Sequence, residues 1–184
     1  VSTSKHSGKP IINCASADFF YHGADGAGYS SAVVAELAGV RQYVQLVGRG
    51  LIGVEAETGR FLWGYNRVAN NTANISSPAV RGDYVFASTA YNTGSALIRI
   101  QRQGEGLRAE EAYFIPSRRF QNHHGGVVLV GDHVYGGHGQ NRGDPACVEL
   151  ATGKVAWRER APARGSASVV YADGNIVYRY DRGD

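Results

Sequence analysis

The stretch that decides the fold reads GVEAETGRFLW at residues 53–63 and returns as CVELATGKVAW at residues 147–157. Both copies contain a small residue, Val, Glu, two variable residues, Thr-Gly, a basic residue, two apolar residues and Trp. Trp63 and Trp157 are 94 residues apart, which is two units of about 47 residues. A period in the forties is typical of repeat proteins built from short strands, so a further copy should lie between them.

A degenerate copy does lie between the two clear ones. The run SALIRI at 95–100 predicts a strand, a turn follows at 104–106, and Phe114 falls at the position of the tryptophans. Phe20 fits an earlier copy in the same way, 43 residues before Trp63. The aromatic position therefore recurs at intervals of 43 to 51 residues.

A second pattern accompanies the first. Each unit begins with a short apolar run, a turn and a second apolar run, at 31–34 with 40–47, 77–80 with 82–86, 126–128 with 131–135, and 168–170 with 173–178. Gly-Asp and Asp-Gly between apolar alternations are strong signals for β-hairpins. Residues 32–40 have helical propensity, but they align with strand-like copies, and local propensity is the weaker guide. Each unit therefore reads as four short strands.

The predicted fold class is all-β: a partial β-propeller of about 3.5 blades, each a four-stranded antiparallel sheet. We expect a single partial propeller domain over residues 1–184. Its expected blade units are 1–21 (incomplete), 30–63, 76–114, 124–157 and 166–184 (incomplete).

The turn in the repeated stretch has a physical role. Its Gly can take a positive φ without penalty and close the hairpin between the third and fourth strands. The acidic residue three positions before Thr can accept hydrogen bonds from turn amides. The terminal aromatic ring can lie between neighbouring blades, where its burial contributes a few kcal/mol. These roles predict a structural docking motif made of Glu55, Thr58, Gly59, Trp63, Glu149, Thr152, Gly153 and Trp157.

The two clear stretches resemble the tryptophan-docking motif of the pyrroloquinoline-quinone (PQQ) propeller repeat family, Ala-x-Asp-x-x-Thr-Gly-x-x-x-Trp. Here Gly53 or Cys147 stands at the first position, and Glu55 or Glu149 stands in place of Asp. The resemblance covers about residues 15–184 and extends to a bacterial branch without assigned activity. Members of that branch are usually exported, which implies a periplasmic or extracellular location.

About 3.5 units are too few for the ring of eight blades that the resemblance implies. The sequence has no Met and begins at Val1, and no signal peptide is visible there. Uncovered sheet edges promote aggregation. We therefore expect a piece of a longer protein whose other blades complete the ring.

Composition excludes several function classes. The net charge of +3 is mild and no basic run concentrates it, so nucleic acid is not an expected partner. No apolar run approaches the ~20 residues of a membrane span. Cys14 and Cys147 are 133 residues apart and form no CxxC motif, which excludes zinc and thioredoxin-like sites of that type. The two thiols are either buried separately or joined in a disulfide.

Polar residues before the first strand of two blades form the candidate binding face. Asn122, His123 and His124 adjoin two glycines, and His138 follows the second strand of the same blade, so together they could bind a quinone or a metal ion. The alternative is that adjacent histidines point to opposite faces of a strand and bind no common ion.

A second polar cluster follows the Trp63 strand and contains Arg67, Asn70, Asn71 and Asn74. It has the same blade position as the stretch near His124, so both should lie on one face. The alternative is an ordinary loop between blades, in which Asn supplies the turns.

Two functions follow. The first is a non-enzymatic scaffold that presents one propeller face to a protein partner or a small ligand. The alternative is part of a PQQ-dependent alcohol dehydrogenase, with PQQ and calcium as cofactors. Such enzymes carry adjacent cysteines, calcium ligands and a tryptophan that stacks on the cofactor; the sequence has no Cys-Cys pair, and both tryptophans are assigned to docking. No catalytic residue and no metal ligand is assigned.

Overall fold

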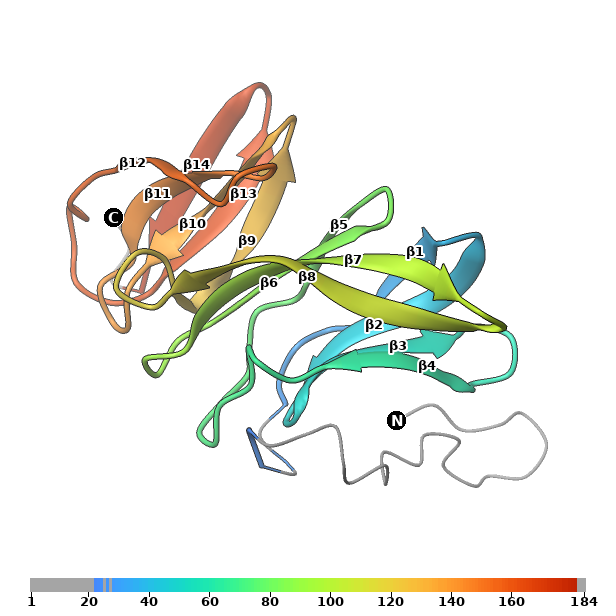
Figure 1. Ribbon diagram of the computed structural model, residues 1–184. Coiled ribbons are helices and arrows are strands. Elements are labelled where there is room, and N and C mark those ends of the chain that lie inside the picture. The colour runs from blue at the N-terminus through green and yellow to red at the C-terminus, as the bar shows by residue number, and fades with distance from the viewer. Residues whose placement is uncertain (1–21, 25, 27, 182–184) are drawn as a thin grey trace.

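The computed structural model describes residues 22–24, 26 and 28–181, and this part of the chain is all-β. It forms 14 strands, and none of the described residues is helical. The strands make three four-stranded antiparallel sheets and one two-stranded sheet, each in sequential order (Figure 1). The fold is the predicted partial β-propeller, with three and a half blades.

The blades follow one another along the chain. Blade 1 contains β1 (Val33–Leu37), β2 (Val40–Val47), β3 (Gly50–Glu55) and β4 (Phe61–Tyr65). Blade 2 contains β5 (Ala79–Arg81), β6 (Tyr84–Thr89), β7 (Gly94–Gln103) and β8 (Gly106–Pro116). Blade 3 contains β9 (Asn122–Val130), β10 (His133–His138), β11 (Asp144–Glu149) and β12 (Val155–Arg158). The half blade contains β13 (Ala167–Ala172) and β14 (Asn175–Tyr180).

The first hairpin of each blade closes through two residues. In blade 1 the closing pair is Ala38 and Gly39, with φ of 49° and 73°, and in the half blade it is Asp173 and Gly174, with φ of 49° and 75°. Two positive φ angles match the twist of the flanking strands. Residues 32–40 thus form β1 and its turn, although their local propensity is helical.

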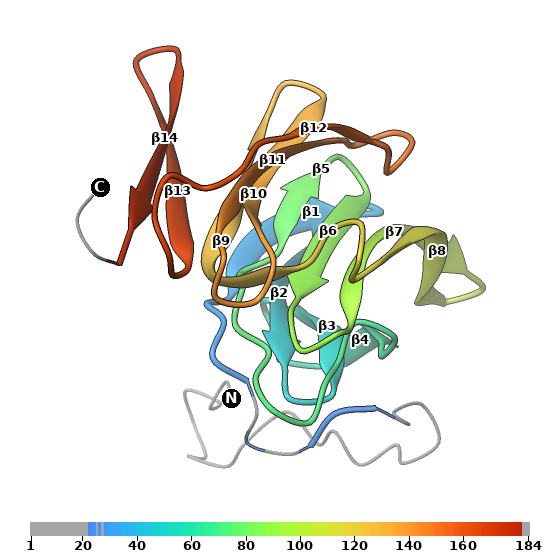
Figure 2. The same cartoon turned by 90° about the vertical axis from the view of Figure 1, so that its left-hand side faces the viewer.

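Neighbouring blades share their cores because their strands are buried on both faces. In β6, Val85 and Ala87 pack into a cluster with blade 1, whereas Phe86 packs into a cluster with blade 3. Successive side chains of a strand point to opposite faces, so an unbroken apolar run fits a sheet that is covered on both sides. Blade 2 is therefore sandwiched between its neighbours (Figures 1 and 2).

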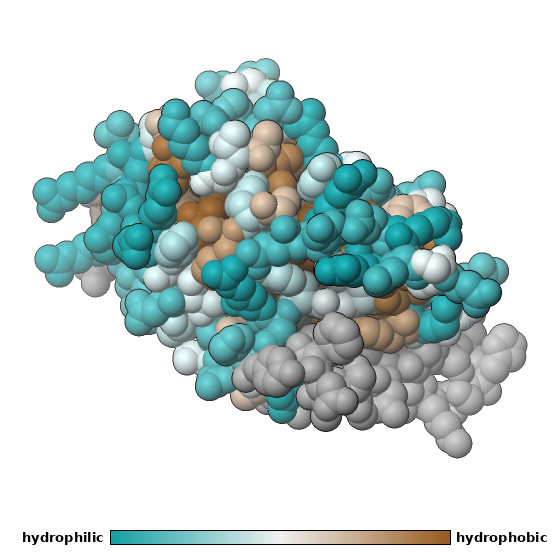
Figure 3. Space-filling model, in the orientation of Figure 1, coloured by the Kyte–Doolittle hydropathy of each residue, from teal (hydrophilic) through white to brown (hydrophobic). Residues whose placement is uncertain are grey.

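The half blade is covered on one side only. Ala167 and Tyr180 are buried near the start of the hairpin, whereas Val170, Tyr171 and Val177 are 47–53% exposed toward its tip. Figure 2 shows the β13–β14 hairpin standing beside β9 at the margin of the molecule. Elsewhere hydrophilic side chains cover much of the visible surface (Figure 3).

The earlier repeat copy, with Phe20 at its aromatic position, lies outside the described residues, as does the whole of the expected incomplete unit 1–21.

Candidate functional site

The two clear copies of the repeated stretch fold into the same turn. In each, the amide of the glycine donates to the glutamate carbonyl four residues earlier, at 2.9 Å for both Gly59 and Gly153. The glycine φ angles are 74° and 70°. These positive values explain the need for Gly, because a Cβ would be strained there.

The glutamate of each turn binds a side chain rather than the turn amides that the sequence suggested. The Thr58 hydroxyl donates to the Glu55 carboxylate, and Thr152 donates to Glu149 at 2.9 Å. The hydrogen bonds from Thr58 and Arg60 lower the pKa of Glu55. The carboxylate therefore fastens the turn through the threonine hydroxyl and a neighbouring base.

Trp63 is part of the core that blades 1 and 2 share. It is 3% exposed, and its indole nitrogen donates to Gln42 Oε1 at 2.6 Å. The ring occupies the space over Gly53, where an added Cβ would lie 2.1 Å from the indole nitrogen. A glycine at this motif position is what lets the indole lie against the strand.

Trp157 differs from Trp63. Cys147 pairs with Trp157 as Gly53 pairs with Trp63, but it has a side chain at the position that is empty in blade 1. Trp157 packs beside Tyr135, with ring centroids 6.1 Å apart, and remains 40% exposed. It is therefore not wedged between two blades in the described part of the chain.

Phe114 has the same strand position as the tryptophans. It pairs with Ala96, which corresponds to Gly53 and Cys147. Arg67 lies over its ring at 4.0 Å from the centroid and forms an ion pair with Glu111 at 2.6 Å. Arg67, which follows β4, thus contacts β8 of blade 2, and neither of these two partners is one of the histidines with which it was grouped.

Asn74 is a structural residue of the loop between β4 and β5. It is fully buried, its Oδ1 accepts from the Asn70 amide at 3.0 Å, and its Nδ2 donates to the Gly48 carbonyl at 3.2 Å. Its main chain pairs with Gly28. This supports the loop interpretation for Asn74.

Asn122 links blades 2 and 3. It is 1% exposed, its Oδ1 accepts from the Ser76 hydroxyl, and its Nδ2 donates to the Gly137 carbonyl at 3.0 Å. Its amide donates to the Ser88 hydroxyl at 2.8 Å. Every polar group of this side chain is used within the protein.

His123 and His124 do not point apart, as the alternative interpretation expected for adjacent strand residues. Their rings stack with centroids 3.6 Å apart. The glycines that follow, of which Gly126 has a φ of 71°, interrupt the regular strand. His123 is buried and both its ring nitrogens have partners, Ser166 at 3.0 Å and Tyr91 at 2.9 Å, while His124 is exposed.

His138 is buried at the end of β10, where it pairs with Asn122 of β9. Its Nδ1 accepts from the Gln121 amide at 3.3 Å, and its ring stacks on Phe120 at 6.1 Å. Burial, with the positive charges of Arg158 and Arg142, lowers its pKa to about 4. Burial and the neighbouring His124 also lower the pKa of His123. Both rings are therefore neutral at pH 7.

Tyr91 joins the two polar stretches, which the sequence did not reveal. Its hydroxyl binds His123, and its ring lines a cavity of about 330 Å³ together with Asn70, Asn71 and Thr72. Tyr91 has a φ of 55° in the loop between β6 and β7. We call the surface formed by the loops β4–β5, β6–β7, β8–β9, β10–β11 and β12–β13 the blade-end face.

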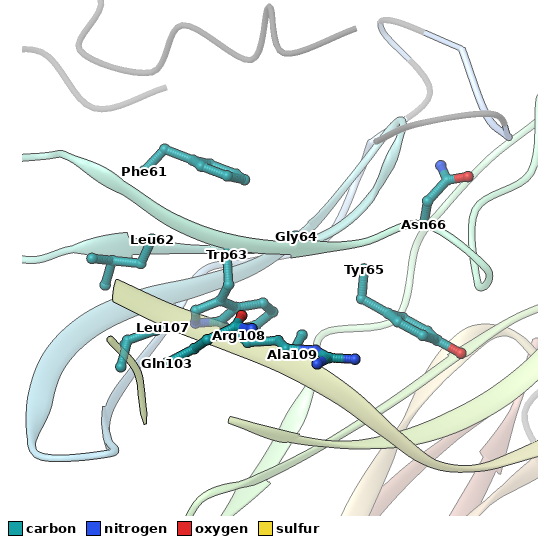
Figure 4. A pocket seen from close by; sticks show the side chains of 10 residues that line it. All are labelled: Phe61, Leu62, Trp63, Gly64, Tyr65, Asn66, Gln103, Leu107, Arg108 and Ala109. Atoms are coloured by element: carbon teal, nitrogen blue, oxygen red, sulfur yellow. The ribbon is translucent and has the colours of Figure 1, made fainter. Parts of the chain in front are cut away.

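A second hollow lies outside this face, between β4 and β8 (Figure 4). It has a volume of about 590 Å³, and Trp63 and Tyr65 extend into it from β4 toward Leu107 and Ala109 of β8. The Tyr65 hydroxyl donates to Glu111, and burial raises its pKa. This hollow therefore lies at the interface between blades 1 and 2.

The residues present do not fit PQQ with calcium. The ring of Trp63 is buried in the core that blades 1 and 2 share, so its faces are not accessible to a cofactor ring. Oxygen ligands are what calcium requires, yet the buried carboxylate of the blade-end face, Asp144, is occupied by Arg142. Within residues 22–24, 26 and 28–181, no three His, Cys, Asp or Glu side chains cluster as metal ligands.

Cys147 is a buried free thiol, and burial raises its pKa. Cys14, the other cysteine of the chain, lies outside the described residues.

The fold and these repeated turns define the class of the protein, a β-propeller built from PQQ-like repeats. The family model described as outer membrane protein assembly factor BamB matches residues 21–159, and the chain belongs to this family. A search of curated proteins found no match. The described part of the chain contains no helix that is long and apolar enough to cross a membrane.

Proposed function

We propose that this segment is a non-catalytic β-propeller scaffold that binds a protein partner through its blade-end face. One observation carries the proposal: the polar side chains of this face hold neighbouring blades to one another. Ser76 binds Asn122 between blades 2 and 3, and His123 binds both Tyr91 of blade 2 and Ser166 before the half blade.

This network favours binding over catalysis. A general acid or base needs a pKa near the working pH and access to substrate. His138 has a pKa of about 4 and is 5% exposed, and both nitrogens of His123 are engaged. The network instead fixes the loops of this face and the start of β9, which carries the exposed His124. A surface that is already ordered loses less entropy when it binds a partner.

The family supports a protein as the partner and an exported location. Its printed description names an outer membrane protein assembly factor. A periplasmic or extracellular scaffold that contacts other proteins is the corresponding role for this chain.

The alternative, a part of a PQQ-dependent alcohol dehydrogenase, is favoured only by the repeat type. A titration with PQQ and calcium, followed by absorbance and by melting temperature, separates the two functions. The scaffold predicts no spectral change and no melting shift up to millimolar ligand. A saturable shift together with dye-coupled alcohol oxidation would overturn the proposal.

A further inference from the structure

A positively charged groove of about 670 Å³ opens on the blade-end face beside blade 3. Its two walls are the loop between β10 and β11 and the segment between β12 and β13. Four arginines and two carboxylates contribute to the lining, Arg142, Arg158, Arg160, Arg164, Asp144 and Glu159. Arginines from distant positions in the sequence thus meet in one groove.

The groove is held open by hydrogen bonds between its walls. Asp144 Oδ1 accepts from the Ala161 amide at 3.2 Å, and the Glu159 amide donates to the Pro145 carbonyl at 2.9 Å. Further along, the Gly165 amide donates to the Asn141 carbonyl at 3.3 Å. These hydrogen bonds hold the β12–β13 segment against the β10–β11 loop at both of its ends, so the groove is formed before any ligand binds.

Most of the positive charge in the groove is not neutralised. Arg142 is paired with Asp144. Arg158, Arg160 and Arg164 are exposed and form no ion pair with any described carboxylate. Counting all six side chains leaves an excess of two positive charges.

The spacing of the unpaired arginines favours an extended ligand. Arg158 ends β12 and Arg160 follows two residues later. Arg160 lies beyond the end of β12, and Arg164 follows four residues later, so the three arginines succeed one another along the wall that the β12–β13 segment forms. An extended peptide with several carboxylates can follow such a row of positive charges. Guanidinium groups bind carboxylates through paired hydrogen bonds.

We propose that this groove binds an extended acidic peptide segment with several Asp or Glu residues. The inference rests on the proposed function, since it assigns a partner chemistry to the blade-end face. A single phosphate would satisfy one or two of the arginines, whereas a peptide can follow them toward Arg164.

The probe is a fluorescein-labelled peptide of alternating aspartate and serine, measured by fluorescence anisotropy with the full chain. We expect saturable binding that weakens as salt rises, because exposed charges are screened. The double variant Arg160→Glu/Arg164→Glu should weaken binding at least about tenfold. The matched control is Arg102→Glu/Arg108→Glu on the β7–β8 hairpin, which should leave the affinity unchanged. Melting temperatures verify that both variants are folded.

Three results would overturn the inference: no saturable binding at low salt, equal weakening by both double variants, or displacement of the peptide by an equal concentration of orthophosphate. A peptide with asparagine in place of aspartate should not bind. If the acidic peptide and PQQ with calcium both fail to bind, the scaffold function stands and only the acidic partner is wrong.

Discussion

Trp63 and Trp157 are the same residue at the same strand position, and their surroundings make them unequal. Trp63 is buried, and its indole nitrogen donates a hydrogen bond to Gln42 Oε1. On the neighbouring strand, Cys147 lies opposite Trp157, whereas Gly53 lies opposite Trp63. The ring of Trp157 packs beside Tyr135. A repeated motif therefore fixes the position of a side chain along the strand, and the residue opposite decides where its ring lies.

Trp63→Phe should destabilise the protein far more than Trp157→Phe. The first change leaves the buried Gln42 amide oxygen without its donor and opens a void, which we expect to cost about 3 kcal/mol. The second acts on a ring that is 40% exposed and should cost less than about 1 kcal/mol. Urea unfolding of both variants measures the difference. Equal losses would contradict the assignment of Trp63 to the shared core.

His138 should make the stability of the protein depend on pH. Its pKa in the folded state is lowered from 6.5 to about 4, mainly by burial. The unfolded chain therefore binds the proton more readily, so the free energy of unfolding falls as pH drops from about 6.5 to about 4. The loss attributable to this residue is on the order of 2–3 kcal/mol.

The measurement is urea unfolding at several pH values between 4 and 7. His138→Gln should flatten the slope in this window, whereas His124→Gln, at the exposed neighbour, should leave most of it. A slope that persists unchanged in His138→Gln would contradict the role of burial.

At the scale of the element, the fourth strand shows what a sequence pattern can and cannot predict. The Thr-Gly turn and the aromatic position were predictable because each depends on local conformation. The β-bulge opposite Gly53 and Val54 was not: Gly53 pairs with Trp63 and Val54 pairs with Phe61, which leaves Leu62 as an extra residue. Figure 4 shows the result, since Phe61 extends to the opposite side of β4 from Trp63.

Gly53→Ala tests the close approach of this strand to the indole. An added methyl group would lie 2.1 Å from the Trp63 indole nitrogen and 2.6 Å from Gln42 Oε1. The Trp63 and Gln42 side chains are buried and hydrogen-bonded to each other, so neither can move aside without loss of packing. We expect the substitution to lower the free energy of unfolding by about 3 kcal/mol. Gly106→Ala is the control, because its nearest neighbour would be 3.7 Å away. Urea unfolding should show a large loss for the first variant only.

At the scale of the whole molecule, the blades were predictable from the period and the binding face was not. Asn122, His123 and His138 were chosen as polar residues beside glycines, and they lie together, but as buried parts of the framework. Local sequence does not show which side of a loop is covered by the next blade. The arginine groove is not evident from the sequence, because Arg142 precedes β11 and Arg158 ends β12, and only the pairing of these two strands brings the two stretches together.

Blades 2 and 3 should behave as a coupled unit because a buried hydrogen bond joins Ser76 to Asn122. Ser76→Ala and Asn122→Ala should each cost about 1–3 kcal/mol, since each leaves a buried partner unsatisfied. The double variant should cost about 1 kcal/mol less than the two single losses combined, because both remove the same bond. Ser76→Ala with Thr152→Ala is the control pair, and its losses should add, because Thr152 lies in an exposed turn and binds Glu149. Additive losses for Ser76 and Asn122 would mean that the hydrogen bond between these two side chains contributes nothing to the coupling of the two blades.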